Sequence, residues 1–117
     1  YTIVRPGWFD YNAPDQLKII MRQGDTHLAG TPADGVIARR QIARVLIDSL
    51  TNPQAARRTL ELVAEHGPEQ PDLGPVFGAL EPDATGSLDG VRDTDNLPVS
   101  DEPRRVLDGL EAGRGDA

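Results

Sequence analysis

The predicted fold follows from the segment Tyr1-Thr-Ile-Val-Arg-Pro-Gly7. Its aromatic and β-branched side chains suit a pleated, covered surface, so residues 1–5 are expected to form a buried strand. Pro6 cannot donate a ladder hydrogen bond and should end the strand, and Gly7 lets the backbone turn or approach another segment closely. Ligands of open α/β sheets lie beyond the carboxyl ends of strands, so the loop from Arg5 to Phe9 is the candidate site.

A hairpin is predicted after this loop. Residues 17–22 should form a strand, and the turn residues Gln23-Gly-Asp25 would return the chain through 26–29 as its partner. Leu17, Ile20 and Met21 also have helical spacing, which leaves a helix over 15–22 as the alternative.

A helix is predicted over residues 39–50, because its apolar side chains recur on one stripe, at Ile42, Val45, Leu46 and Leu50. Asn52-Pro53 should end this helix. Residues 59–64 alternate as a further strand. Strand 1–5, a crossover with the helix and strand 59–64 are compatible with a right-handed parallel unit. The expected class is therefore α/β, with the order strand, hairpin, helix, strand.

Charge and composition change near residues 66–68. Residues 1–64 carry 8 basic and 6 acidic side chains, net +2, whereas residues 65–117 carry 4 basic and 13 acidic side chains, net −9. The second part also holds 8 of the 12 glycines and 6 of the 10 prolines. We therefore expect one domain part over 1–64 and an acidic, Pro/Gly-rich extension over 65–117. Two short helices are predicted in it, over 72–80 and 101–111, with Asp72 and Ser100 as caps.

The overall composition excludes several classes of function. A net charge of −7 and a pI near 4.6 argue against binding to nucleic acid and to acidic membranes. No apolar run approaches the roughly 20 residues of a membrane helix. The chain has no cysteine, and His27 and His66 are isolated, so no metal site is predicted. A reduced, cytoplasmic setting is the default expectation.

Three segments carry a resemblance to a known family. They are Tyr1-Thr-Ile-Val-Arg-Pro-Gly7, Val36-Ile-Ala-Arg-Arg-Gln-Ile-Ala-Arg-Val-Leu46 and Arg58-Thr-Leu-Glu-Leu62. In order and spacing they resemble the later part of atypical short-chain dehydrogenase/reductase proteins, the NmrA-like, NAD(P)-binding relatives of sugar epimerases. The resemblance covers roughly residues 1–64. It implies the later part of a Rossmann-like parallel sheet.

The resemblance also implies roles for particular residues. Arg5, Pro6 and Gly7 would run beside the nicotinamide of NAD or NADP. A small-molecule substrate would lie against Trp8, Phe9, Tyr11 and Arg39. Four of the five aromatic residues lie within residues 1–11, and aromatic side chains are common in ligand pockets, although an aromatic plug over the core is the alternative. A cation at the start of a helix invites an anion, so Arg39 would contact one unless it is simply solvated.

Two motifs of dinucleotide enzymes are absent. The sequence has no glycine-rich GxGxxG phosphate cradle and no Tyr-x-x-x-Lys pair. It also lacks the acidic residue that the family has at the position of Gln41 or one position away. Together with the resemblance, the absence of the cradle implies part of a larger NAD(P)-dependent oxidoreductase-like or epimerase-like protein. The upstream half of the Rossmann domain, or a second copy of the chain, would complete it. Alone, the chain should be inactive and should not bind the dinucleotide tightly.

Two other functions remain open at this point. The first is a non-catalytic NAD(P)-binding sensor or interaction module of the NmrA-like type. The second is a small acidic adaptor without a ligand. A Tyr-x-x-x-Lys pair encoded upstream would favour the enzyme over the sensor, and a glycine-rich loop there would favour either over the adaptor.

Overall fold

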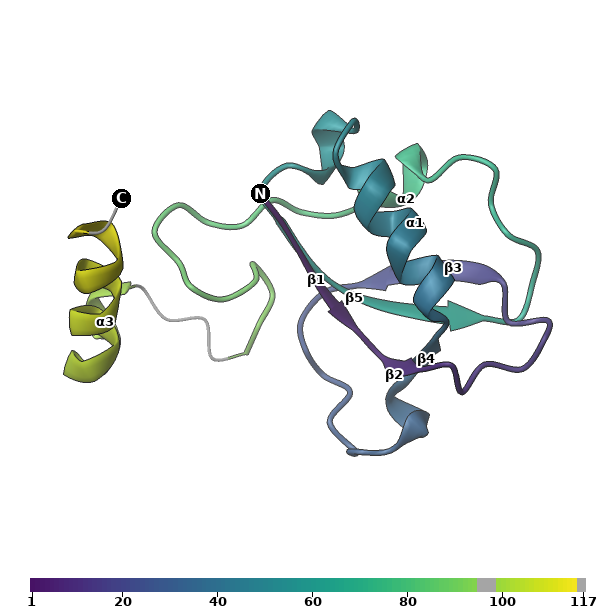
Figure 1. Cartoon of the computed structure of the whole chain (residues 1–117), viewed down its shortest axis with the longest axis horizontal. Coiled ribbons are helices and arrows are strands. Elements are labelled where there is room, and N and C mark those ends of the chain that lie inside the picture. Colours follow the sequence, from purple (N-terminus) through teal and green to yellow (C-terminus); the bar gives the residue numbers. More distant parts are fainter. Residues whose placement is uncertain (95–98, 116–117) are drawn as a thin grey trace.

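A computed structural model of the chain describes residues 1–94 and 99–115, which form an α/β fold around one mixed sheet (Figure 1). The strands are β1 (Thr2–Pro6), β2 (Trp8–Phe9), β3 (Lys18–Arg22), β4 (Val36–Ile37) and β5 (Arg58–Glu65). The α-helices are α1 (Arg39–Ser49), α2 (Gly74–Gly78) and α3 (Arg104–Gly115). Short 3-10 turns occupy Pro32–Asp34, Pro53–Ala55 and Val99–Asp101. Residues 95–98 and 116–117 of the predicted extension lie outside the described residues.

Strand β5 is the centre of the sheet. It pairs in parallel with β1, from Thr2 opposite Arg58 to Pro6 opposite Leu62. It also pairs antiparallel with β3 and, at a single position, with β4, and β4 in turn pairs in parallel with β2. The predicted strands 1–5, 17–22 and 59–64 and the predicted helix 39–50 are confirmed in place and type. The predicted burial of strand 1–5 is wrong, because β1 lies at the edge of the sheet and its residues are half-buried or exposed. A helix over 15–22 does not form.

The predicted hairpin is wrong. Residues 26–29 form no strand, and β3 instead pairs with β5, so the sheet is mixed rather than parallel. Gly24 and Asp25 do turn the chain, with φ of 111° and 50°. The following backbone is then held by the Asp34 carboxylate, which accepts hydrogen bonds from the N–H groups of Ala29 and Gly30. These donors are therefore used in a loop rather than in a ladder.

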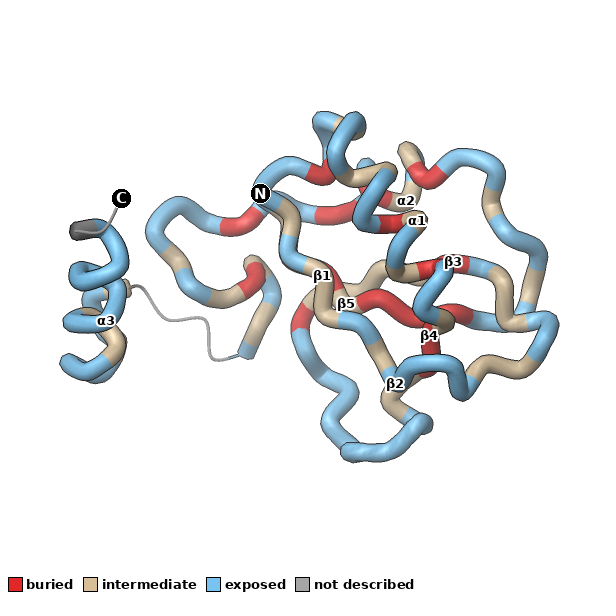
Figure 2. The backbone as a smooth tube through the Cα atoms, viewed as in Figure 1, coloured by how far each residue is buried: buried red, intermediate tan, exposed pale blue. Residues whose placement is uncertain are grey.

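The apolar core lies between the sheet and helices α1 and α2. Leu60 and Leu62 of β5 and Val45 of α1 are fully buried, and Figure 2 shows buried residues along much of β5. The predicted extension joins the same cluster through Leu73, Phe77 and Leu80. The predicted helix 72–80 is present as the shorter α2, and the Asp72 carboxylate accepts from the N–H of Gly74 at 2.8 Å. The segment after β5 therefore helps to hold the sheet.

The last helix begins later than predicted. Ser100 lies inside the 3-10 turn Val99–Asp101 and does not cap α3, which begins at Arg104. The reason is Pro103, because the residue before a proline is disfavoured in the helical region. Helix α3 lies apart from the sheet in Figure 1. Within residues 1–94 and 99–115, no helix combines the length and the apolar character that crossing a membrane requires.

Candidate functional site

A pocket of about 470 Å³ opens at the carboxyl end of β1. All five residues of the predicted loop, from Arg5 to Phe9, line it. The rest of its wall comes from β3, β5 and the loop between β3 and β4, through Arg22, Asp25, His27, Asp34, Glu61 and Val63. The structure therefore brings the predicted nicotinamide-side residues together with charged groups from distant parts of the chain.

Two glycines bring the backbone of this wall together. The N–H of Gly7 donates to the carbonyl of Leu62 at 2.9 Å, and the N–H of Trp8 donates to the carbonyl of Gly35 at 3.0 Å. A Cβ on Gly7 would lie 2.6 Å from the Gly35 oxygen, so only glycine fits there. This close approach turns the chain from β1 into β2. It leaves Trp8 41% and Phe9 50% exposed at the pocket, rather than packed over the core.

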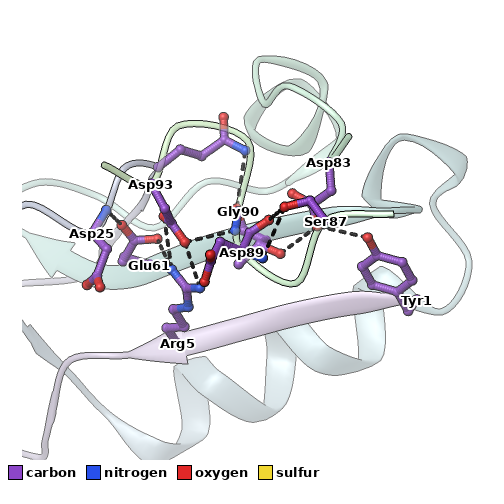
Figure 3. Close-up of polar contacts among 11 residues, drawn as sticks. Tyr1, Arg5, Asp25, Glu61, Asp83, Ser87, Asp89, Gly90 and Asp93 are labelled. Atoms are coloured by element: carbon purple, nitrogen blue, oxygen red, sulfur yellow. Dashed lines mark hydrogen bonds and ion pairs between the residues drawn. The ribbon is translucent and has the colours of Figure 1, made fainter. Parts of the chain in front are cut away.

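Arg5 forms a two-pronged ion pair with Asp93 (Figure 3). Its Nη1 and Nη2 donate to the two carboxylate oxygens of Asp93 at 3.2 and 2.9 Å, and Asp93 also accepts from the N–H of Gly90 at 2.8 Å. The paired geometry is that of a guanidinium fork on a carboxylate, and it raises the pKa of Arg5 and lowers the pKa of Asp93. Asp93 lies 88 residues after Arg5 in the chain, so no local sequence pattern points to this pair.

Glu61 lies beside this pair. Its Oε2 is 3.9 Å from Nη1 of Arg5, while its Oε1 accepts from the N–H of Asp25. Oε2 is buried and has no hydrogen-bond partner among the described residues. Burial raises the pKa of the Glu61 carboxyl, which makes it a candidate to take up or release a proton in the pocket. Sequence reasoning missed Glu61, although an acidic residue inside an apolar strand was a usable signal.

The remaining charged groups of the pocket mainly order the loop between β3 and β4. Both oxygens of Asp34 accept backbone N–H groups at 2.7 Å, and the bond from Ala29 is the main cause that lowers the pKa of Asp34. Arg22 donates to the Asp34 carbonyl and to Glu65, each at 3.3 Å. His27 is exposed on this loop and lines the pocket.

Two predicted substrate residues do not line the pocket. Tyr11 packs edge-on against Trp8, with ring centroids 6.0 Å apart at 90°, and so contacts the aromatic wall without lining the pocket. Arg39, at the start of α1, donates from Nε to Asp10 at 2.6 Å and is 77% exposed. The anion expected near this helix start is therefore Asp10 of the same chain. The Arg39 backbone N–H is the main cause that lowers the pKa of Asp10.

The family that the sequence resembles has an acidic residue at the position of Gln41 or one position away. Gln41 is buried, its Oε1 accepts from the Ala38 N–H at 2.8 Å and from Asn12 at 2.9 Å, and its Nε2 donates to the Gln16 carbonyl. These contacts tie the start of α1 to the loop before β3. Gln41 therefore has a structural role away from the pocket.

No group of three or more histidine, aspartate or glutamate side chains in residues 1–94 and 99–115 is arranged to hold a metal ion. The chain matches no protein-family model, and no curated protein is similar to it in sequence.

Proposed function

We propose that this chain is the later part of a Rossmann-like, NAD(P)-binding domain in an oxidoreductase-like or epimerase-like protein. In this proposal, Arg5, Pro6 and Gly7 run beside the nicotinamide, and Trp8 and Phe9 contact a small-molecule substrate. Tyr11 acts through Trp8. Arg39 has no direct role, because its side chain lies on Asp10 instead.

One observation carries the proposal: the pocket at the carboxyl end of β1. Strands β1 and β5 are parallel neighbours, and α1 lies between them in sequence together with the short strands β2 and β4 and the antiparallel strand β3. A helix in the connection between parallel neighbours is the feature shared with Rossmann-like sheets. In such sheets, ligands bind just beyond the carboxyl ends of the strands. The pocket has this position, and it combines an aromatic wall with a few charged groups, as small-molecule sites do.

The unpaired outer edge of β1 favours the proposal of a larger sheet. Among the described residues, β1 pairs on one side alone, with β5. Ile3 on β1 is 44% exposed, and on neighbouring α1 the side chains of Leu46, Ile47 and Leu50 are 45%, 65% and 83% exposed. Parallel strands are normally covered and flanked by other strands. We propose that further strands lie along this edge, supplied by the upstream half of the domain or by a second copy of the chain.

The proposed chemistry depends mainly on positioning. A bound NAD(P) would supply the hydride, while the residues of this chain orient the nicotinamide and the substrate against each other. Burial raises the pKa of Glu61, whose carboxyl lies 3.9 Å from Arg5, so Glu61 is the group of this site best placed to exchange a proton with a ligand. The pyrophosphate cradle is missing from the sequence, so the dinucleotide would be held mostly by other parts of the protein.

Calorimetry tests this proposal. NADH and NADPH are titrated into the 117-residue chain and into a polypeptide that also contains the residues encoded before Tyr1. We expect weak or undetectable binding to the chain alone and a dissociation constant in the range of about 1 μM to 1 mM for the longer polypeptide. If the longer polypeptide binds neither dinucleotide, the proposal fails.

The sensor remains the second candidate, because the chain carries no Tyr-x-x-x-Lys pair. A sensor would bind the dinucleotide without turnover. Consumption of NADH or NADPH by the longer polypeptide, followed with a panel of ketones and aldehydes, separates the two functions. Steady turnover identifies the enzyme, whereas tight binding without turnover identifies the sensor.

A further inference from the structure

Residues 81–93 form a strap that crosses one face of the sheet. Side chains alternate along a strand, and Arg5 lies opposite Glu61 in the β1–β5 register, so both project from the face opposite Leu60 and Leu62. The strap covers this face, since a Cβ on Gly90 would lie 3.3 Å from Cβ of Thr59. It therefore runs from the amino end of β1 to the pocket.

The first end of the strap is firmly attached. Asp83 is 7% exposed, and its Oδ2 accepts from the hydroxyls of Thr59 at 2.6 Å and Tyr1 at 2.9 Å. The N–H of Asp83 donates to the carbonyl of Arg57 at 2.7 Å. Two hydrogen bonds between Gln23 and the backbone of Glu81 add to this attachment. The first end is thus held by several hydrogen bonds around the buried carboxylate of Asp83.

The second end of the strap is attached to a residue of the pocket. Asp93 holds both nitrogens of the Arg5 fork, and Arg5 lines the pocket with its side chain 33% exposed (Figure 3). Gly86, with φ of 82°, and Gly90 lie between the two ends and allow the backbone to bend. A group that competes for Arg5 could therefore release the second end while the first stays in place.

We propose that the pocket binds a carboxylate with a flat apolar body, and that Asp93 occupies the carboxylate position at Arg5 until this ligand replaces it. A guanidinium fork matches a planar carboxylate in two parallel hydrogen bonds, which is the contact Asp93 now makes. The aromatic rings of Trp8 and Phe9 line the same pocket and offer apolar surface to the rest of the ligand. The inference rests on the substrate pocket of the proposed function and specifies what it binds.

Because of the charges near Arg5, the ligand carboxylate must replace Asp93 rather than bind in addition to it. Arg5 already has Asp93 at 2.9 Å and Glu61 at 3.9 Å, and the charge of Asp25 in the same pocket also acts on it. A further carboxylate would be repelled by these groups. Replacing Asp93 with the ligand keeps the number of charges constant. The strap is therefore a built-in competitor, and its release accompanies binding.

The probe for the test is benzoate, with benzamide as its uncharged control. Trp8 is the only tryptophan of the chain and lines the pocket, so its fluorescence reports binding. The D93N substitution keeps the size of the side chain and an oxygen that can accept from Gly90, but it removes the charge that competes for Arg5. D108N on α3 removes the same charge from an exposed site and serves as the matched control.

We expect benzoate to bind D93N about tenfold more tightly than the unchanged chain, which corresponds to about 1.4 kcal/mol. D108N should bind as the unchanged chain does, R5Q should not bind, and benzamide should bind none of them. Equal affinity of D93N and the unchanged chain for benzoate, or equal binding of benzamide, overturns the proposal.

A second measurement uses the unchanged chain and does not depend on how the variants fold. The Gly90 N–H donates to Asp93, so its hydrogen exchange reports the release of the strap. Saturating benzoate should accelerate this exchange severalfold, and unchanged exchange under saturation overturns the proposal. No dinucleotide is present in either assay. A failure here therefore leaves the calorimetric test of the proposed function standing, and the reverse also holds.

Discussion

Replacing Gly35 with alanine tests how the pocket wall is built. Gly35 has φ of 126° and ψ of 152°, a region that is essentially restricted to glycine. A Cβ at this position would lie 2.9 Å from Cβ of Val63 and would overlap its Cγ1. Val63 is only 3% exposed on β5 and has little room to move.

The expected loss of stability has two parts. Holding alanine in this backbone region costs about 1–3 kcal/mol. Crowding a packed side chain costs about 1–3 kcal/mol more. The sum, about 2–6 kcal/mol, is large beside the roughly 5–15 kcal/mol that stabilises a typical domain. The matched control is G30A, because Gly30 also has a positive φ, of 74°, but a Cβ there would meet nothing within 4 Å. Its cost should be backbone strain alone, about 1–2 kcal/mol.

Urea unfolding followed by far-ultraviolet circular dichroism measures both variants. The free energy of unfolding should fall further in G35A than in G30A, by at least about 1 kcal/mol, with the same urea dependence. The Trp8 emission should also change in G35A, because the Trp8 N–H donates to the Gly35 carbonyl. Equal losses in the two variants would refute the close approach between Gly35 and Val63.

Three more predictions follow from the structure. F77A should lower the free energy of unfolding by about 3–5 kcal/mol, because Phe77 is fully buried. L110A on α3 should lower it by less than about 1 kcal/mol, because Leu110 is 40% exposed, and urea unfolding measures both variants. The lowered pKa of Asp93 should make the native state lose stability as the pH falls through and below the usual aspartate value of about 3.9, and unfolding curves of R5Q should show a smaller loss over the same range. The open edge of β1 should make the chain associate at high concentration, which sedimentation would detect, and a monomer at every concentration would contradict this.

Local patterns predicted much of the fold. The β-branched residues of 1–5, the apolar spacing of 39–50 and the alternation of 59–64 were enough to locate these three elements. Their burial differs from the pattern, because Leu46 and Leu50 of the helix are exposed while both Leu62 and Val63 of β5 are buried. The predicted return strand at 26–29 does not form, and no side chain of this segment is buried: Leu28 is 76% exposed. The true partner of β3 is β5, some forty residues further on, and such a long-range pairing leaves no local signal.

The site was predictable where it follows from a strand end. Arg5 to Phe9 were found because ligands of open α/β sheets lie beyond such ends. Asp93 was not, since its contact with Arg5 depends on the path of the strap. Arg39 was placed in the pocket because a helix start invites an anion. The pairing of β2 with β4 instead brings Asp10 to this position, with the Asp10 N–H donating to the Ile37 carbonyl at 2.8 Å.

The most direct test of the proposed function is amide hydrogen exchange of a polypeptide that contains this chain and the residues encoded before Tyr1, with and without NADH. If the carboxyl end of β1 lies beside the nicotinamide, bound NADH should slow the exchange of Gly7, Trp8 and Phe9. The amides of Thr51 and Ala56, at the opposite end of β1 and α1, should be unaffected. Binding of NADH without protection of residues 7–9 would contradict the proposal.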